Sequence, residues 1–221
     1  GAAQSIASQT SEIPVLITAV TDPVDAGLVQ SSEAPGTNVT GTNDMNPIRE
    51  QLELIPEILP DAQTVGLLYT SSEDNSALQI QEVKAVLEEM NVGYVEQTVT
   101  GSNDVQQAVQ SILGKCDALY IPTDNTLAAS AALVGSAAQT AKIPVFWGEG
   151  NCVAEGGLAS LGLDYYNLGR QTGEMAVEVL EGADPAVMPI QSQSDYSYTI
   201  SKSMAEEIGI EIPKHLLEFA E

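Results

Sequence analysis

Polar side chains follow five apolar runs of the sequence, each at the point where the run ends. Hydroxyl, amide and carboxylate groups gathered around one cleft could bind a small ligand that carries both an ammonium and a carboxylate group. The ligand carboxylate would accept from free N–H groups at helix starts, and the ammonium would donate to a side-chain carboxylate. The candidate ligand-binding residues are Thr18, Thr21, Asp22, Thr70, Ser71, Glu73, Asn75, Ser76, Thr123, Asp124, Asn125, Thr126, Glu149, Asp164 and Tyr165.

We assign roles within this set from charge. Asp124 or Asp164 is the expected partner of a ligand ammonium group. The N–H groups around Asn75 and Ser76, or those around Thr21 and Asp22, are expected to bind the ligand carboxylate. Aromatic residues near the same run ends would line a pocket for an apolar tail; they are Tyr69, Tyr120, Trp147, Tyr165 and Tyr166.

Each loop also has a purely structural interpretation. Ser, Thr, Asp and Asn are the usual N-caps of helices, and Asn75, Asp124 and Asp164 each come just before or at a predicted helix start. Capping is the simpler explanation of any single loop. The five loops taken together favour a ring of hydrogen-bonding groups around a cleft.

Signals for catalysis are weak. The sequence contains no GxSxG, HExxH or GxxxxGK[ST] motif. Cys116 and Cys152 lie 36 positions apart without a CxxC motif, and the one histidine, His215, is near the C-terminus. Pairs of carboxylates could act as general acid and base in a glycosidase, but 31 Asp and Glu make chance neighbours common. We expect no catalytic residue, no metal site and no cofactor.

Composition excludes two classes of partner. The 221 residues contain 7 Lys and Arg against 31 Asp and Glu, a formal net charge of −24. Nucleic acid is not expected as a partner, because a phosphate backbone needs basic side chains to displace its counterions. Adsorption to anionic lipid is disfavoured for the same reason. No run approaches the roughly 18–20 apolar residues that span a bilayer, and a hydrophobic fraction of 43% fits a globular protein.

The elements that must position these loops alternate between strand and helix. Several of the short apolar runs are nearly continuous, as in strands covered on both faces. Strands are predicted at 13–20, 64–69, 92–99, 118–122, 144–147 and 158–163, and helices at 47–59, 76–91, 104–113, 126–142 and 165–181. Asp104 is expected to cap the third of these helices. This alternation predicts a doubly wound α/β fold with a parallel sheet.

A short internal repeat suggests two similar halves. The letters AAQS precede EIPVL at 12–16, and AAQT precedes KIPVF at 142–146, so each copy is a helix followed by a strand and a polar loop. Ligands bind in open α/β sheets at the ends of such strands. The first half has room for only one helix and one strand before Asn43, so we expect the chain to begin inside a longer protein.

Several segments resemble one family, the substrate-binding components of ABC importers of the tryptophan/tyrosine type. The similar segments are IPVLITAVTDPVDAGLV at 13–29, NVTGTND at 38–44, YIPTDN at 120–125 and FWGE at 146–149. The most specific one is GLDYYNLGRQTG at 162–173. The resemblance covers essentially all 221 residues in the family's order.

The resemblance implies a type I periplasmic-binding-protein fold, in which three crossovers join two α/β lobes and hinge closure traps a ligand. Lobe I would comprise 1–44 and 165–187, and lobe II 45–164 and 188–221. Family chains begin with a further strand–helix–strand–helix–strand segment, so lobe I is expected to be incomplete here. Ser201 stands where the family usually has Asn.

The function implied is that of an extracytoplasmic solute-binding protein, periplasmic or anchored as a lipoprotein. It would be a monomer that delivers an amino acid, possibly an aromatic one, to an ABC permease in the membrane, and it would not be an enzyme. A ligand-sensing or regulatory module on the same fold is the alternative. A carboxylate-dependent hydrolase is the least favoured class.

Overall fold

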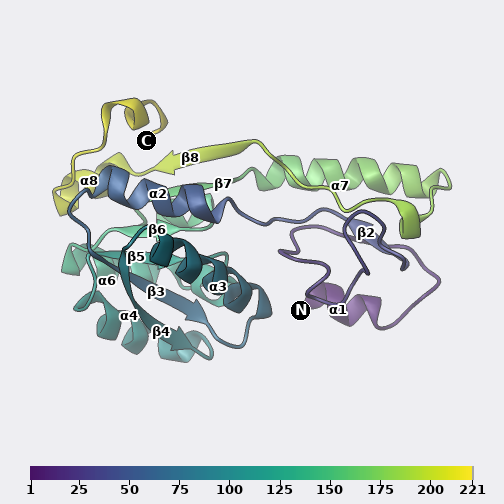
Figure 1. The fold of residues 1–221 in the computed structure, drawn as a ribbon, viewed down its shortest axis with the longest axis horizontal. Coiled ribbons are helices and arrows are strands. Elements are labelled where there is room, and N and C mark those ends of the chain that lie inside the picture. The colour runs from purple at the N-terminus through teal and green to yellow at the C-terminus, as the bar shows by residue number, and fades with distance from the viewer. Residues whose placement is uncertain (221) are drawn as a thin grey trace. The chain divides into compact units, whose positions relative to one another are not determined.

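The computed structural model describes residues 1–220 and divides the chain into two units (Figure 1). Unit 1 comprises Gly1–Asn46 and Leu163–Tyr196, and unit 2 comprises Pro47–Gly162 and Ser197–Glu221. The chain therefore passes between the units three times. In the described part of the chain, no helix has the length and apolar character needed to cross a membrane.

Unit 2 is built on a six-stranded sheet with the strand order β4-β3-β5-β6-β7-β8. The pairings from β4 through to β7 are all parallel, which confirms the predicted parallel α/β architecture. The strands are β3 (Thr64–Thr70), β4 (Gly93–Val99), β5 (Ala118–Ile121), β6 (Val145–Trp147), β7 (Ala159–Leu163) and β8 (Tyr196–Ile200).

Helices cover both faces of this sheet, as the continuous apolar strands predict. Their bounds are α2 (Ile48–Ile58), α3 (Asp74–Glu89), α4 (Val105–Leu113), α5 (Asn125–Ala128), α6 (Ala131–Ala141) and α8 (Lys202–Ile208), with the short turns η1 (Ser102–Asp104), η2 (Gly150–Glu155) and η4 (Lys214–Phe219). The helices α4 and α6 lie on one side of the sheet and α2 on the other (Figure 1). The core between the sheet and α4 and α6 includes Val109 and Ile112 of α4 and Trp147 of β6.

Unit 1 contains a two-stranded parallel sheet, β1 (Val15–Ile17) and β2 (Val39–Gly41). Its helical elements are α1 (Ala2–Ala7), α7 (Tyr165–Leu180) and the short turn η3 (Pro185–Val187). Gly41 has φ +142°, and a Cβ there would lie 1.9 Å from the Ile17 carbonyl oxygen, so only glycine fits this pairing. A small apolar core that includes Ile17, Val39 and Ile190 supports the sheet.

Some predicted elements differ from the structure. The strand expected at 13–20 is limited to Val15–Ile17, because Pro14 has no N–H to donate and Ala19 turns to φ +54°. The helix expected at 126–142 is two helices that meet at Ala129 and Ser130. Asp104 occupies the cap position of α4, but its carboxylate accepts from Thr100 instead of from the helix. The pattern of apolar runs did not predict β2, β8 or α8, although the family resemblance places a strand-to-helix junction at Ser201, between β8 and α8.

The third passage between units also lies later than predicted. Residues 188–196 were expected in lobe II, whereas the structure assigns them to unit 1. The backbone explains the difference: the Ile190 N–H donates to the Ser32 carbonyl at 2.7 Å, and the Gln191 N–H donates to the Gly41 carbonyl at 2.9 Å. Main-chain hydrogen bonds thus hold this segment against β2, which hydropathy alone does not show.

The two copies of the short repeat are helix–strand pairs. The first contains α1 and β1 in unit 1, and the second contains α6 and β6 in unit 2. Each copy therefore ends in a loop at the carboxyl end of a parallel strand. This is the edge at which open α/β sheets bind ligands.

Candidate ligand-binding loops

Three loops of unit 2, at 70–76, 122–126 and 148–149, lie at the carboxyl ends of the neighbouring strands β3, β5 and β6. We call them the strand-end loops. Nine predicted residues come together in the first two of them, since β3 pairs with β5. They are Thr70, Ser71, Glu73, Asn75, Ser76, Thr123, Asp124, Asn125 and Thr126.

Asp124 has a structural role in this cluster. Its side chain is 2% exposed, and Oδ2 accepts from the Thr70 backbone N–H at 2.6 Å. Oδ1 accepts from the Thr70 hydroxyl at 2.8 Å and from the Leu127 N–H at 2.9 Å, which caps α5. Both oxygens are thus used to join β3 to α5. We therefore withdraw the prediction that Asp124 binds the ligand ammonium group.

Glu73 joins the same two loops from the other side. One carboxylate oxygen accepts from the backbone and side chain of Asn125 at 3.0 and 2.7 Å, and the other accepts from those of Thr126 at 2.9 and 2.7 Å. Burial by itself raises the pKa of Glu73, but these four hydrogen bonds outweigh burial and lower the pKa. The carboxylate is therefore ionised and fixed at the start of α5.

Gln79 of α3 fixes the Thr123 peptide and was not predicted. Its Nε2 donates to the Thr123 carbonyl at 3.2 Å, and its Oε1 accepts from the Thr123 N–H at 3.2 Å. The Asn75 side chain donates to the same carbonyl at 2.9 Å, and the Ser76 hydroxyl lies 3.4 Å from it. Gln79 is fully buried on the inner face of α3. A glutamine at an otherwise apolar helix position is the sequence signal that could have identified it.

Glu149 follows β6, and its carboxylate makes fewer hydrogen bonds within the protein than those of Glu73 and Asp124. It is half-buried, and the hydrogen bond found for its carboxylate is a long one, accepted by Oε1 from the Asn151 amide at 3.3 Å. Gly148 before it is held tightly: its N–H donates to the Ile121 carbonyl at 2.7 Å. A Cβ on Gly148 would lie 2.7 Å from the Thr123 nitrogen, so β5 and β6 approach closely here.

In unit 1, the predicted residues Thr18, Thr21 and Asp22 follow β1. Asp22 Oδ1 accepts from the N–H groups of Val24 and Asp25 at 2.8 and 3.0 Å, so this carboxylate stabilises its own turn. Thr21 is buried and Thr18 is exposed. The Thr18 hydroxyl lies 3.4 Å from that of Thr42, which follows β2.

Asp164 and Tyr165 begin α7 in unit 1. Asp164 Oδ1 accepts from the N–H groups of Tyr166 and Asn167, and Oδ2 accepts from the Asn167 side chain at 2.6 Å. The capping interpretation is confirmed, and Asp164 is withdrawn as the ammonium partner. The Tyr165 hydroxyl donates to Oδ2 of Asp44 at 3.1 Å. Asp44 was not among the predicted residues, although it belongs to the segment at 38–44.

The predicted aromatic pocket is not formed as expected. Tyr120 is fully buried and Trp147 is 2% exposed, so both belong to the interior of unit 2. Tyr166 is 81% exposed on α7, and the Tyr69 hydroxyl donates to Glu96. An aromatic residue near a strand end can face either the sheet interior or the loop, and the sequence does not distinguish these orientations.

The sulfur and imidazole groups are placed as expected for structural residues. Cys116 and Cys152 are free and buried, and burial raises their pKa values to about 11 and about 12. His215 pairs with Glu57 on the surface. Among residues 1–220, no group of His, Cys, Asp and Glu is arranged to hold a metal ion.

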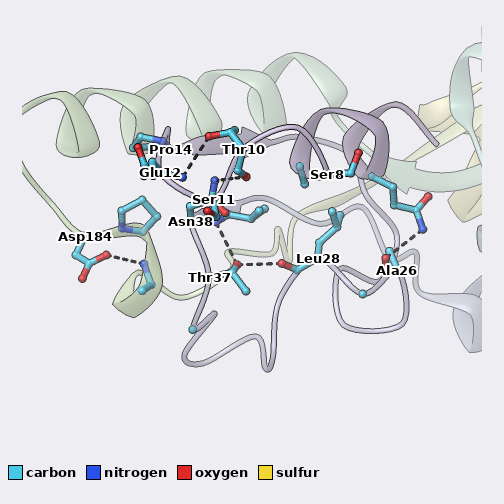
Figure 2. Close-up of a pocket in the computed structure, with 17 residues that line it drawn as sticks. Ser8, Thr10, Ser11, Glu12, Pro14, Ala26, Leu28, Thr37, Asn38 and Asp184 are labelled. Carbon is cyan, nitrogen blue, oxygen red and sulfur yellow. Dashed lines mark hydrogen bonds between the residues drawn. The ribbon is translucent and has the colours of Figure 1, made fainter.

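Unit 1 contains a hollow of about 890 Å³ (Figure 2). Its walls include Thr10 and Pro14 before β1, Thr37 and Asn38 before or at the start of β2, and Asp184. These residues mark the amino ends of the two strands. Ligands of parallel sheets bind at the carboxyl ends, so this hollow is not our candidate site.

Comparisons with known proteins agree with this architecture. A tyrosine-binding protein of Clostridioides difficile (strain R20291) is 39% identical over 209 residues, which are 95% of this chain and 61% of that protein. An ABC domain from Streptococcus pneumonia, solved in complex with L-Trp, is 42% identical with a TM-score of 0.95, over 99% of this chain and 74% of that chain. An ABC transporter solute binding protein from Bacillus halodurans, solved with myo-inositol, is 15% identical with a TM-score of 0.61, over 94% of this chain and 74% of that chain, and shows the fold alone.

The predicted fold class is confirmed by these structural neighbours. The chain spans 61% and 52% of the lengths of the two curated relatives that it matches. The family described as ABC transporter substrate binding protein matches residues 1–221. This is a family of binding proteins and not of enzymes. On the combined evidence of sequence, fold and strand-end loops, the chain belongs to the ABC transporter substrate binding protein family.

Proposed function

We propose that this protein binds an amino acid and delivers it to an ABC permease. The observation that carries the proposal is the family match over residues 1–221, together with relatives named for tyrosine binding and solved with L-Trp. The same match supports a location outside the cytoplasm, in the periplasm or on a lipid anchor. We further propose that the protein acts as a monomer without catalysis or cofactor.

Glu149 is our revised choice for the residue that binds the ligand ammonium group. Asp124, Glu73 and Asp164 each use both carboxylate oxygens inside the protein. Glu149 is half-buried at a strand end, where an ammonium group would replace water around its carboxylate. A charge-assisted hydrogen bond to a partly desolvated carboxylate contributes more than a neutral one.

For the ligand carboxylate we propose the backbone N–H groups around Asn75 at the start of α3. The start of this 16-residue helix carries backbone N–H groups and the positive end of the helix dipole, both of which favour an anion. In unit 1, we propose Thr18, Thr21, Asp22 and Tyr165 as further ligand contacts, since they lie at the carboxyl end of β1 and at the start of α7.

A thermal-shift and calorimetric screen of the twenty amino acids against the full-length protein tests the function. At about 100 times its dissociation constant, a bound amino acid should raise the free energy of unfolding by about 2.7 kcal/mol. We expect L-tyrosine or L-tryptophan to produce the largest rise in Tm. If none of the twenty changes Tm or releases heat, the amino-acid assignment is wrong.

The substitution Glu149→Gln tests the assigned contact. Removing the negative charge should lower affinity for the bound amino acid by at least tenfold, or about 1.4 kcal/mol. The matched control is Glu155→Gln, which removes an exposed carboxylate at the other end of η2 and should leave affinity unchanged. Equal affinities of the Glu149→Gln variant and the wild type would exclude Glu149 as the ammonium partner.

The fold by itself does not select transport over sensing, because it is shared by proteins of both kinds. The genes next to this one provide the test of the partner. Adjacent genes for a permease and an ATPase would support delivery to a transporter. A fused DNA-binding or kinase domain in the full-length protein would instead support the sensing alternative.

A further inference from the structure

Gln51 is the one polar side chain on the buried face of α2. The buried residues of this helix are Ile48, Gln51, Leu52, Leu54, Ile55 and Ile58, and Gln51 is 2% exposed. Burying an amide is costly unless its donors and acceptor are all used. An apolar residue at position 51 would continue the apolar face of α2, so the presence of glutamine needs a specific explanation.

The Gln51 amide contacts three strands of unit 2. Its Nε2 donates to the Leu161 carbonyl of β7 at 2.6 Å and, more weakly, to the Gly148 carbonyl after β6 at 3.4 Å. Its Oε1 accepts from the Tyr120 hydroxyl of β5 at 2.6 Å. Carbonyl oxygens only accept, so the two backbone contacts fix which end of the amide faces them. Burial raises the pKa of Tyr120, which keeps its hydroxyl protonated as the donor.

These contacts lie where β6 and β7 stop pairing. The last paired residues of the two strands are Trp147 of β6 and Ser160 of β7. Gly148 and Leu161 are the residues that follow them in the chain. Both are buried, and buried carbonyls require donors. The Gln51 amide supplies these donors beyond the end of the ladder. It therefore links the backbone that follows β6 to β7, next to Glu149.

Gly148 is also held from the β5 side. Its N–H donates to the Ile121 carbonyl, and a Cβ on it would lie 2.8 Å from the Pro122 carbonyl carbon and 2.7 Å from the Thr123 nitrogen. With the longer contact from Gln51 to its carbonyl, the Gly148 peptide has hydrogen-bond partners on both sides. The direction in which the chain continues to Glu149 is set by this peptide.

We propose that Gln51 is a positioning residue that, by bonding the Gly148 carbonyl after β6 and the Leu161 carbonyl of β7, places the Glu149 carboxylate against the ammonium group of the ligand. The inference rests on the proposed function. It adds to the proposed ammonium contact, Glu149, a buried amide on α2 that positions it.

The test compares L-tryptophan with indole-3-propionate, which has the same ring and carboxylate but no amino group. The discrimination ratio is the affinity for the first divided by the affinity for the second, measured by calorimetry on the full-length protein. The substitution Gln51→Met keeps the side-chain volume and removes the hydrogen bonds. It should lower the ratio at least fivefold, as Glu149→Gln should, and the double variant should lower it no further than Glu149→Gln alone.

A destabilised but unrelated variant separates positioning from folding. Val109→Ala creates a cavity in the core beneath α4, away from the strand-end loops, and should lower Tm without changing the ratio. If Gln51→Met also lowers Tm and leaves the ratio unchanged, Gln51 is structural only and the inference is overturned.

If the Gln51→Met protein does not fold, the variant Tyr120→Phe provides the test instead. It removes one hydroxyl and leaves both bonds from Gln51 Nε2, so it should lower the ratio in the same direction by a smaller factor. A ratio equal to that of the wild type would overturn the inference. A wild-type protein that binds no amino acid at all would instead overturn the proposed function, and this inference with it.

Discussion

At the scale of single residues, four of the acidic side chains next to the strand ends illustrate two different roles. Asp124, Glu73 and Asp164 use both carboxylate oxygens to hold loops and helix starts in place. Glu149 makes one long internal hydrogen bond and is half-exposed. A carboxylate whose oxygens are already occupied can bind a ligand only by giving up internal bonds. The geometry thus distinguishes the carboxylates that hold the loops from Glu149, which we propose as a ligand contact.

Glu73 yields a prediction on pH. Its pKa is lowered below the ordinary value of 4.5, so the folded protein holds the carboxylate ionised where the unfolded chain begins to bind a proton. This contribution to stability is complete above about pH 5 and is lost as the pH falls through the lowered pKa. In Glu73→Gln, an amide NH₂ replaces one accepting oxygen, which should cost about 1 kcal/mol at pH 7 after allowance for partial exposure.

Urea unfolding of the wild type and Glu73→Gln between pH 3 and 7 measures this effect. The difference in stability between them should be largest at neutral pH and should shrink below about pH 4.5. Glu82→Gln, on the same helix but outside the loops, is the control and should show no such convergence. A Glu73→Gln deficit that stays constant over the whole pH range would contradict the assignment.

The residue types at the candidate site were predictable from the sequence, but their partners were not. The sequence places Thr70, Asp124 and Glu73 at neighbouring strand ends, because the order of apolar runs determines where each strand stops. Which oxygen accepts from which N–H depends on angles set by packing. Gln51 and Gln79 were missed because they lie within helices and not in the polar segments after the strands, and only their burial among apolar residues identifies them.

At the scale of elements, α6 approaches the turn η2 closely through two glycines. A Cβ on Gly135 would lie 2.4 Å from the Glu155 carbonyl oxygen and 2.6 Å from the Gly156 Cα. Gly156 has φ +118°, a conformation that favours glycine. Both obstacles are backbone atoms, which cannot rotate away as a side chain can. The helix can therefore reach this position only with glycine at 135.

The substitution Gly135→Ala should accordingly destabilise the protein. In an exposed helix, Gly→Ala stabilises by about 0.5–1 kcal/mol, but the clash here should cost about 1–3 kcal/mol and reverse the sign. The matched control is Gly173→Ala on α7, where a Cβ meets nothing within 4 Å and the usual stabilisation should appear. Urea unfolding measures both; an increase in stability for Gly135→Ala would show that α6 and η2 are not in contact in solution.

Periodicity predicted the strongly patterned elements and missed the weak ones. The helix α4 shows the i, i+3, i+4, i+7 spacing that packing against a sheet requires, and it lies where expected. Periodicity did not predict strands β2 and β8: β2 is three residues long, and β8 is an edge strand on which Tyr196 is exposed and Tyr198 is half-buried. The break between α5 and α6 has no Gly or Pro to mark it. Contacts with distant parts of the chain determine the secondary structure of such segments, and the local hydrophobic pattern does not contain this information.

At the scale of the whole molecule, charge is the dominant feature. The chain has 7 basic and 31 acidic side chains. Folding brings the acidic side chains closer together, so their mutual repulsion destabilises the folded state relative to the unfolded chain. Salt shortens the range of this repulsion from about 30 Å at 0.01 M to about 10 Å at 0.1 M. We therefore expect Tm to rise by about 3 °C or more between 10 and 500 mM NaCl.

Differential scanning calorimetry at a series of salt concentrations measures this rise. NaCl and KCl should act alike at equal ionic strength, because screening depends on charge and not on the ion. A difference between the two would indicate a specific ion site, and a falling Tm would indicate that ion pairs outweigh the net repulsion.

The single tryptophan of the chain, Trp147, is 2% exposed in the interior of unit 2. Light at 295 nm therefore excites a fluorophore in one half of the molecule, whereas circular dichroism follows the helices of both. If the two halves melt separately, the emission spectrum will shift to the red at one temperature only, while ellipticity falls in two steps. The chain thus carries a built-in, label-free probe that tells which half comes apart first.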